Sequence, residues 1–390
     1  MYRVTRLFRN FIKGGDLILL LLCLVANIFG CVVVASTTNT MGSTRYVIIQ
    51  IAAALIGVLL YILITNIDTE IFSENRWILI CFNLFLLLLL IPFGTDNGTG
   101  NKSWLDIPLV PVDIQPAEIC KISFVLVLAS VMNSHQSRIS SPKSVLHMVF
   151  HLLLLVGLNM VLSRVLGVSM IFGFIFAGMA FAGGVSLIWF GLAVGLIVTA
   201  WPFFWNYFLD GYQKQRIQIL YDPTIDPQGI GPRYHSKMSL RSLTGGGLTG
   251  QGLFNGNRTQ TPDALFAQHT DYIFSAIGEE LGYVGCVLVV LLLLLIVARC
   301  IYVGMKTPDY MRRLVCFGAA AALSFQIISN VGMCIGITPV IGLTLPFISY
   351  GGSSLVSLYA LMGLVSGVHA RPTAPSHERY IRLPPDWGDR

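Results

Sequence analysis

Apolar residues occur in ten long runs along the chain, and polar residues gather in the segments between those runs. As a helix that rises about 1.5 Å per residue, each run with its flanking residues can cross the roughly 30 Å hydrocarbon core of a bilayer. The pattern predicts an all-α polytopic membrane protein with ten spans, at about Leu17–Ala35, Tyr46–Ile64, Trp77–Pro92, Pro116–Met132, Val145–Leu162, Val168–Gly183, Leu187–Phe204, Leu281–Ala298, Leu314–Ile335 and Ser353–Val368.

The longest hydrophilic segment, residues 206–277, separates spans seven and eight, and a shorter one covers residues 94–115. Lys and Arg near span ends favour the cytoplasmic side. They are frequent on the side that includes both chain ends, whereas the short segments on the other side contain only Arg45, Lys102 and Arg164. We therefore expect both termini in the cytoplasm and both hydrophilic segments outside. Residues 1–16 form a basic tail, residues 17–369 the membrane domain, and residues 370–390 a tail expected to be disordered.

The composition supports this class and excludes others. Hydrophobic residues make up 55% of the chain and the mean hydropathy is +0.73, which no soluble fold of this size could bury. The net charge of +6 does not call for a nucleic-acid partner, and we find neither a cytoplasmic domain nor a GxxxxGK[ST] motif for ATP hydrolysis. A cleaved signal peptide is the alternative for the first run, but the run exceeds the roughly 7–15 apolar residues of such peptides.

Several ionisable residues lie close together where the large loop meets the eighth span. His269 and Asp271 fall within Gln268–Phe274, and Glu279 and Glu280 follow just before the apolar run. In a chain with only 11% charged residues, a cluster of acids at the boundary between water and lipid indicates a specific role. One such role is chemistry on a substrate that is half polar and half lipid.

The fourth span opens with Gln115, Pro116 and Glu118, and Lys121 follows one helical turn after Glu118. On a helix these two charges project from one face and can pair. Ionisable groups at membrane level are costly unless they are paired or line water, so the pair is a candidate site. The alternative is a structural ion pair that braces the bundle.

The segment between the last two spans contains the helix-breaking residues Pro346, Gly351 and Gly352, together with Ser349. Irregular backbone at membrane level persists only where protein or water satisfies its polar groups. We therefore expect this segment to wall a cavity.

Other polar residues permit two interpretations. In the large loop, Arg233 and Lys237 precede a glycine run at 245–252 whose backbone amides can hold an anion. Arg164 can bind a phosphate or simply lie at the interface. His147 and His151, one turn apart near the inner end of the fifth span, can bind a metal or simply pack.

Taken together, these motifs resemble the SEDS family of shape, elongation, division and sporulation proteins, which includes RodA, FtsW and SpoVE. The resemblance covers nearly the whole chain. The glycine and glutamine pattern is more similar to RodA, whereas Gly342–Pro346 is more similar to FtsW, and on balance the resemblance favours RodA. The matching segments are Trp104–Leu105, Gln115–Lys121, Asp222–Pro227, the glycine run, Gln268–Phe274, Gly278–Gly282 and Leu345–Ser354.

The resemblance implies a peptidoglycan glycosyltransferase that polymerises lipid II, an undecaprenyl-diphosphate-linked disaccharide peptide, at the outer face of the bacterial cytoplasmic membrane. It implies a class B penicillin-binding protein as a transpeptidase partner, within an elongation or division complex. It also implies that Asp271 is the catalytic residue and that Trp104, Glu118 and Lys121 line or support the same cleft.

In this mechanism Asp271 takes the proton of the attacking sugar hydroxyl as a general base. Lys121, Lys237, Arg233 or a divalent cation such as Mg or Mn stabilises the departing diphosphate, and His269 is a further substrate contact. Gln115, Pro116, Glu279, Glu280, Pro346, Ser349, Gly351 and Gly352 are expected to shape the cleft.

One departure from the family pattern leaves other functions open. Members usually have Gln-Pro-Asp-Leu-Gly-Thr where this chain has Ser163–Val168, so an acid is absent and Arg164 is gained. The alternatives are a flippase or transporter of lipid-linked precursors, and a SEDS-like scaffold without catalysis. Retention of Asp271 argues against the scaffold, and a carrier needs its site near the midplane of the membrane.

Overall fold

The computed structural model describes residues 8–9, 11–68, 70–71, 75–95, 102–106, 114–207, 209, 211–226, 233–262 and 264–372. Most of the predicted C-terminal tail, residues 373–390, and most of the basic tail's first ten residues lie outside the described residues, as does Pro227 of the Asp-Pro pair.

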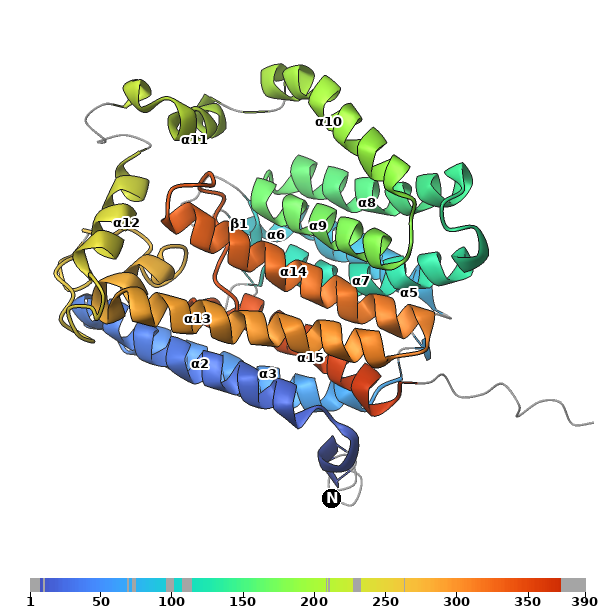
Figure 1. Ribbon diagram of the computed structural model, residues 1–390, viewed down its shortest axis with the longest axis horizontal. Helices are drawn as coiled ribbons and strands as arrows, with labels where there is room; N and C mark the ends of the chain where they lie inside the picture. The colour runs from blue at the N-terminus through green and yellow to red at the C-terminus, as the bar shows by residue number, and fades with distance from the viewer. Residues whose placement is uncertain are drawn as a thin grey trace, which may run out of the picture.

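Each of the ten predicted runs forms a helix, as Figure 1 shows. In the described part of the chain nine helices are long and apolar enough to span a membrane, and α9, with 17 residues, is the shorter tenth. The prediction of a ten-helix membrane protein is thus confirmed. The helices are α2 (Leu17–Thr37), α3 (Arg45–Thr65), α5 (Arg76–Leu88) with its continuation α6 (Leu90–Phe93), α7 (Pro116–Ser134), α8 (Pro142–Leu162), α9 (Leu166–Ala182), α10 (Leu187–Tyr207), α13 (Ile273–Lys306), α14 (Tyr310–Cys334) and α15 (Gly352–Ala370).

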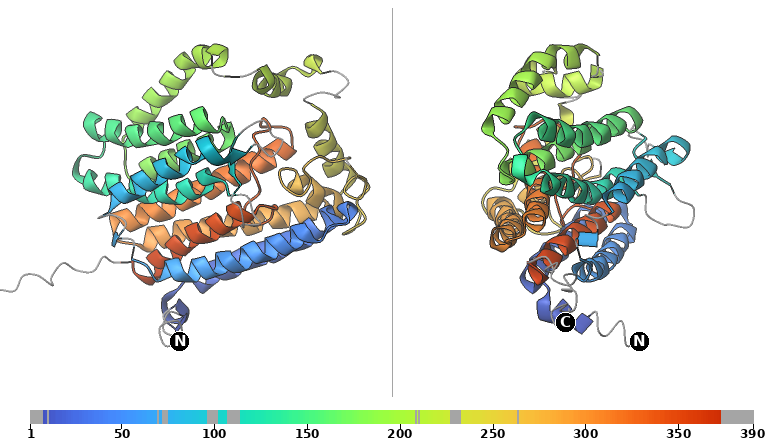
Figure 2. Two further views of the ribbon diagram at one scale, coloured as in Figure 1. Left: turned by 180° about the vertical axis from the view of Figure 1, so that it is seen from behind. Right: turned by 90° about the vertical axis from the view of Figure 1, so that its right-hand side faces the viewer.

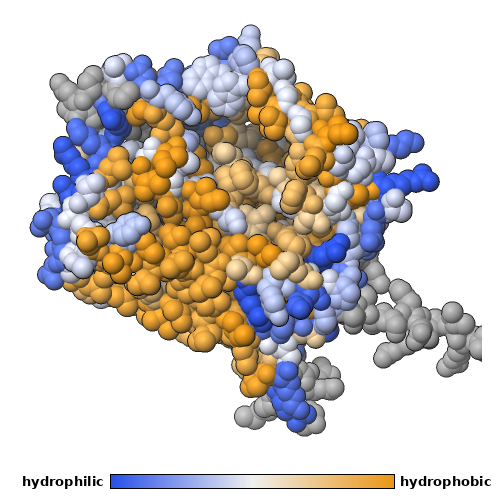
Figure 3. All heavy atoms as spheres, viewed as in Figure 1, coloured by the Kyte–Doolittle hydropathy of each residue, from blue (hydrophilic) through white to orange (hydrophobic). Residues whose placement is uncertain are grey.

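The centre of the bundle consists of α7, α14 and α15, most of whose residues are buried. Around them, α15 packs against α3, α14 packs against α13 and α9, and α7 packs against α5. The outer helices bury one side only and present apolar residues on the other, which Figure 3 shows as a broad hydrophobic face between hydrophilic ends. This is the surface expected of a bundle whose solvent is lipid.

Helix α10 stands apart from this bundle. None of its residues is buried, and two opposite views show it crossing above the other helices (Figures 1 and 2). Apart from Trp189 and Phe190 at its start, which pack against the core, its apolar side chains are largely exposed.

The large loop contains regular structure that the hydropathy pattern did not predict. It includes α11 (Gly211–Tyr221), the short 3₁₀ helix η3 (Pro223–Ile225) and α12 (Tyr234–Gly245), which lie at the left end of the molecule in Figure 1. The shorter hydrophilic segment contributes a small antiparallel pair, β1 (Gly94–Thr95) with β2 (Trp104–Leu105). These elements are too short, or too polar, to have produced an apolar run.

Helix α13 begins at Ile273, eight residues before the predicted start of the eighth span. It is interrupted at Gly282, whose φ of 69° and ψ of −166° are not helical. At 34 residues it would extend about 51 Å, well beyond a roughly 30 Å hydrocarbon core. The part before Gly282 is almost entirely buried within the protein, where α13 contacts α12 and α2.

The glycine run packs backbone against backbone on this interrupted segment. The Gln251 amide donates to the Glu279 carbonyl over 3.0 Å, and the Tyr283 amide donates to the Gly247 carbonyl over 2.9 Å. Such close approach explains the glycines, because a Cβ on Gly250 would lie 2.1 Å from the Glu280 carbonyl oxygen. The run thus docks the loop on α13, which differs from the anion cradle considered above.

Both described ends of the membrane domain lie at the same end of the bundle. The Asp16 carboxylate pairs with the Arg299 guanidinium at 2.9 Å, and the Asp16 amide donates to the Ser366 hydroxyl over 3.0 Å. These contacts join the start of α2 to the ends of α13 and α15, as an even number of spans requires.

Replacing Gly246 by Ala tests the docking of the loop. A Cβ there would lie 1.9 Å from the Gly278 carbonyl oxygen, so we expect Gly246→Ala to lower the free energy of unfolding by more than about 2 kcal/mol. The matched control is Gly245→Ala, whose Cβ would meet only flexible side-chain ends at 3.4 Å. Thermal unfolding in one detergent compares them, and equal midpoints for both variants would contradict the docking.

Candidate active site

Asp271 belongs to a short segment whose backbone is held by the connector between α14 and α15, residues 335–351. Three successive carbonyl oxygens each accept a hydrogen bond. His269 accepts from the Tyr350 amide at 2.8 Å, and Thr270 accepts from the Ser349 hydroxyl at 2.7 Å. Asp271 accepts from the side-chain amide of Asn330 on α14 at 2.8 Å. The segment bearing Asp271 is therefore fixed residue by residue.

The connector is held in turn by amide side chains from three spans. Gln50 of α3 donates to the Ser349 carbonyl at 3.1 Å, Asn27 of α2 donates to the Phe347 carbonyl at 3.3 Å, and Asn330 donates to the Leu343 carbonyl at 2.7 Å. Pro346 is buried within it. The helix-breaking segment is thus satisfied by protein, as irregular backbone at membrane level must be.

The Asp271 carboxylate is partly buried and faces Gly342 of the connector. Its Oδ2 lies 3.7 Å from where a Cβ on Gly342 would be, so glycine leaves room beside the carboxylate. Burial raises the pKa of Asp271 to about 6, and the Arg216 guanidinium opposes that rise. At neutral pH the group is mostly ionised, yet it holds a proton far better than an ordinary aspartate.

The His269 ring lies against two tyrosines. Its centroid is 4.9 Å from that of Tyr46 on α3 and 5.7 Å from that of Tyr350. Burial lowers the pKa of His269, so its imidazole is neutral at pH 7. The three rings form an apolar wall with polar tips next to Asp271.

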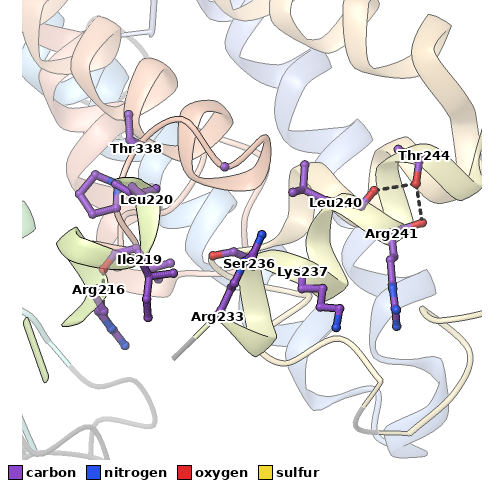
Figure 4. A pocket seen from close by; sticks show the side chains of 13 residues that line it. Arg216, Ile219, Leu220, Arg233, Ser236, Lys237, Leu240, Arg241, Thr244 and Thr338 are labelled. Carbon is purple, nitrogen blue, oxygen red and sulfur yellow. Dashed lines mark hydrogen bonds between the residues drawn. The ribbon is translucent and has the colours of Figure 1, made fainter. Parts of the chain in front are cut away.

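A cationic pocket of about 280 Å³ lies between α11, α12 and the connector (Figure 4). Four basic side chains line it: Arg216 from α11 and Arg233, Lys237 and Arg241 from the start and body of α12. Its other lining residues are apolar or hydroxylic, and no Asp or Glu is among the described residues that line it. Such a pocket suits an anion with several oxygens.

The structure brings two of the predicted substrate residues, Arg233 and Lys237, into this pocket. Arg216 and Arg241 were missed. The signal for Arg241 was its spacing: residues 233, 237 and 241 follow at intervals of four, which places them on one face of a helix in a segment expected to be irregular. Arg216 had no comparable signal, because its place depends on how α11 meets the connector.

The predicted Glu118–Lys121 pair is present, with 2.7 Å between Lys121 Nζ and Glu118 Oε2, and both side chains are buried. Ser357 of α15 donates to Glu118 Oε2 at 3.0 Å, about one and a half turns below the start of α15. Pro116 occupies the first turn of α7, preceded by Gln115. The pair therefore joins α7 to α15, and its contact with substrate stays a prediction.

Glu279 and Glu280 are fully buried away from the pocket and fasten the loop. Glu279 accepts from the backbone amides of Arg258 and Thr259 at 2.9 and 3.2 Å. Glu280 accepts from the hydroxyls of Ser36 and Thr259 at 2.6 and 2.7 Å. Their carboxylates join α13, the loop and α2, and a role in shaping the cleft stays a prediction.

The remaining candidates lie elsewhere. Trp104 is half-buried on β2, opposite Thr95 of β1, and its role in the cleft stays a prediction. Arg164 is exposed between α8 and α9 with a φ of 54°. His147 contacts both His151 and His135. Gly351 and Gly352 cap and begin α15. Among the described residues, no group of three His, Cys, Asp or Glu side chains is arranged to hold a metal ion.

The fold and this site define a polytopic membrane protein with a general-base candidate and an anion pocket at one end of its bundle. The family model described as a cell cycle protein, for FtsW, RodA and SpoVE, matches residues 16–373. The chain therefore belongs to the FtsW, RodA and SpoVE family.

Individual relatives agree with this. The chain is 30% identical to "Peptidoglycan glycosyltransferase MrdB" of Escherichia coli K12 over 91% of its length and 93% of that protein. It is 31% identical to "Probable peptidoglycan glycosyltransferase FtsW" of Thiomicrospira cyclica, over 90% of each.

Solved structures are similar over the same extent. A chain from "Structural coordination of polymerization and crosslinking by a peptidoglycan synthase complex" matches with a TM-score of 0.75 and 27% identity, covering 92% of this chain and 98% of that one. The rod shape determining protein RodA of Thermus thermophilus matches with a TM-score of 0.68 and 26% identity, over 93% and 98%.

The raised pKa of Asp271 predicts that this residue costs stability. Because the folded protein favours the protonated carboxyl, stability falls as pH rises from about 4 to about 6 and then stays level. At pH 7.5 the cost is on the order of 3 kcal/mol for a shift of about two units. We expect Asp271→Asn to unfold at a higher temperature than the parent at pH 7.5, and at a similar temperature at pH 4.

A control of opposite sign is available. The exposed Asp222 has a pKa lowered by hydrogen bonds from Thr224, so Asp222→Asn should not stabilise the protein at pH 7.5. If Asp271→Asn were no more stable than the parent at pH 7.5, the carboxylate would not be buried as described.

Proposed function

We propose that this protein is a peptidoglycan glycosyltransferase that polymerises lipid II at the outer face of the bacterial cytoplasmic membrane. The observation that carries the proposal is the placement of Asp271, a carboxylate with a raised pKa, beside a cationic pocket at one end of a membrane bundle. The relatives that share the fold are named for the same activity.

In the reaction, the 4-hydroxyl of one sugar attacks the anomeric carbon of another, and a lipid diphosphate leaves. The Asp271 carboxylate takes the proton of the attacking hydroxyl as the new glycosidic bond forms. A pKa of about 6 suits this task, since the group is ionised at neutral pH and still binds a proton well. The three hydrogen bonds to residues 269–271 keep the carboxylate in place while charge moves.

The cationic pocket holds the diphosphate of the donor. Its bond to the anomeric carbon breaks with the electron pair going to the phosphate oxygen, so negative charge grows there. Arg216, Arg233, Lys237 and Arg241 are already positioned to stabilise that charge. These four side chains carry the charge neutralisation in the proposal. A divalent cation such as Mg or Mn, the alternative named from the sequence, stays a prediction.

The lipid tails of donor and acceptor lie along the spans. Because α10 buries no residue, a lipid tail can lie beside it on either side. A prenyl chain in that position would not bury any polar group of the protein. A substrate that is half lipid explains why the chain consists largely of a membrane domain.

Orientation and partner complete the proposal. The excess of Lys and Arg at the end that holds both termini supports a cytoplasmic position for that end and an outer position for Asp271. A class B penicillin-binding protein that cross-links the new strands is the proposed partner, in line with the similar chain from a complex described for polymerization and crosslinking.

The direct test is polymerisation of purified lipid II by the purified protein, with and without candidate partners. We expect glycan strands from the parent and a loss of at least about 100-fold in rate for Asp271→Asn, the usual scale for a general base. Asp222→Asn serves as the matched control and should polymerise like the parent. Near-normal glycan strands from Asp271→Asn would show that Asp271 is not the general base. Movement of lipid II across the membrane without formation of glycosidic bonds would favour the flippase.

Asn330 provides a second test, because it positions Asp271 without being a candidate base. Both Asn330→Ala and Asn27→Ala remove a buried amide that bonds the connector, so each should cost about 1–3 kcal/mol of stability. Only Asn330 reaches the Asp271 carbonyl. We expect Asn330→Ala to lower kcat for polymerisation at least tenfold more than Asn27→Ala, and an equal loss in both would show that only connector stability matters.

A further inference from the structure

Arg216 touches both parts of the site. Its Nη1 donates to the Val340 carbonyl of the connector over 2.9 Å, and its side chain lines the cationic pocket. Two residues further along the connector, Gly342 lies against the Asp271 carboxylate. Since two Cα–Cα steps span at most about 7 Å, the guanidinium is anchored close to the point that the carboxylate faces.

The charge of Arg216 acts on Asp271 in this arrangement. Burial raises the pKa of Asp271, and Arg216 is the cation that opposes the rise. Burial lowers the pKa of the neighbouring His235, and the same guanidinium lowers it further. Arg216 can thus interact with two anions, the Asp271 carboxylate and an anion bound in the cationic pocket.

We propose that Arg216 couples occupancy of the cationic pocket by the donor diphosphate to the base strength of Asp271. This inference rests on the proposed function. Before the donor binds, Arg216 helps to keep Asp271 ionised and therefore weakly basic. Once the diphosphate neutralises Arg216, the carboxylate loses that support and accepts a proton more readily, at the moment when an acceptor hydroxyl can use it.

Coupling of this kind is reciprocal. If the diphosphate makes Asp271 more basic, an ionised Asp271 must weaken binding of the diphosphate by the same factor. Direct repulsion between the two anions also weakens binding, but it does not pass through Arg216. The two contributions can therefore be separated by removing Arg216.

A double-mutant cycle with inorganic diphosphate measures this without catalysis. The proteins are the parent, Asp271→Asn, Arg216→Gln and the double variant, each as the full chain in lipid nanodiscs at pH 7.5. We expect Asp271→Asn to bind diphosphate about tenfold more tightly than the parent, the equivalent of about one pKa unit. In the Arg216→Gln background this ratio should fall to about twofold or less. A ratio that stays the same or grows would overturn the coupling and leave direct repulsion.

The pH dependence of polymerisation is the second readout. The acid limb of kcat/KM reports the base in the free enzyme, so loss of the cation should move it to higher pH. We expect a shift of about one unit in Arg216→Gln, the low end for an opposite charge near an aspartate. Arg216→Lys keeps the charge and a donor for Val340, and it should keep the limb within about 0.3 units of the parent.

Lys237→Gln is the control for the pocket. It removes a cation that lines the cavity, so we expect a higher KM for the donor with the acid limb in its original place. The coupling is refuted if the acid limb of kcat/KM stays in place in Arg216→Gln. The proposed function still stands in that case, provided that Asp271→Asn abolishes polymerisation. Activity that survives Asp271→Asn refutes the base, whatever the binding cycle shows.

Discussion

The hydrogen bonds that the carbonyl oxygens of His269, Thr270 and Asp271 accept are the constraint on which the rest of the site depends. A loop between a polar domain and a membrane span would ordinarily be mobile. Here every carbonyl of the segment is bonded to groups that begin, end or lie between two central helices. The carboxylate of Asp271 is positioned by a rigid frame, which is the condition under which a single acid can serve as a base.

The connector that supplies this frame is itself held by amide side chains placed within spans. Gln50, Asn27 and Asn330 would each be costly in hydrocarbon, and each is buried with its amide nitrogen bonded to a carbonyl of the connector. Because an unpaired amide in the bundle would cost several kcal/mol, these side chains favour one register of α2, α3 and α14 around the connector. The buried amide side chains thus determine the position of the connector at the site, and they also stabilise the fold.

The features that could be predicted from the sequence are those encoded by residues close together in the chain. Apolar runs and the spacing of Glu118 and Lys121 are local, and they predicted the ten helices and the buried ion pair. The early start of α13 was missed because its first turns are buried by the loop, so their polarity resembled that of a water-exposed segment. Arg216 was missed for a related reason: its importance comes from a contact with Val340, 124 residues away, which no periodicity records.

The connector also has a mechanical consequence. The backbone of His269 and Thr270 is bonded to it at Tyr350 and Ser349, and the guanidinium of Arg216 is bonded to it at Val340. A displacement of the connector therefore moves the segment that bears Asp271 and the guanidinium of Arg216 in the same direction. The separation between base and cation is then less sensitive to helix motion than the position of either group.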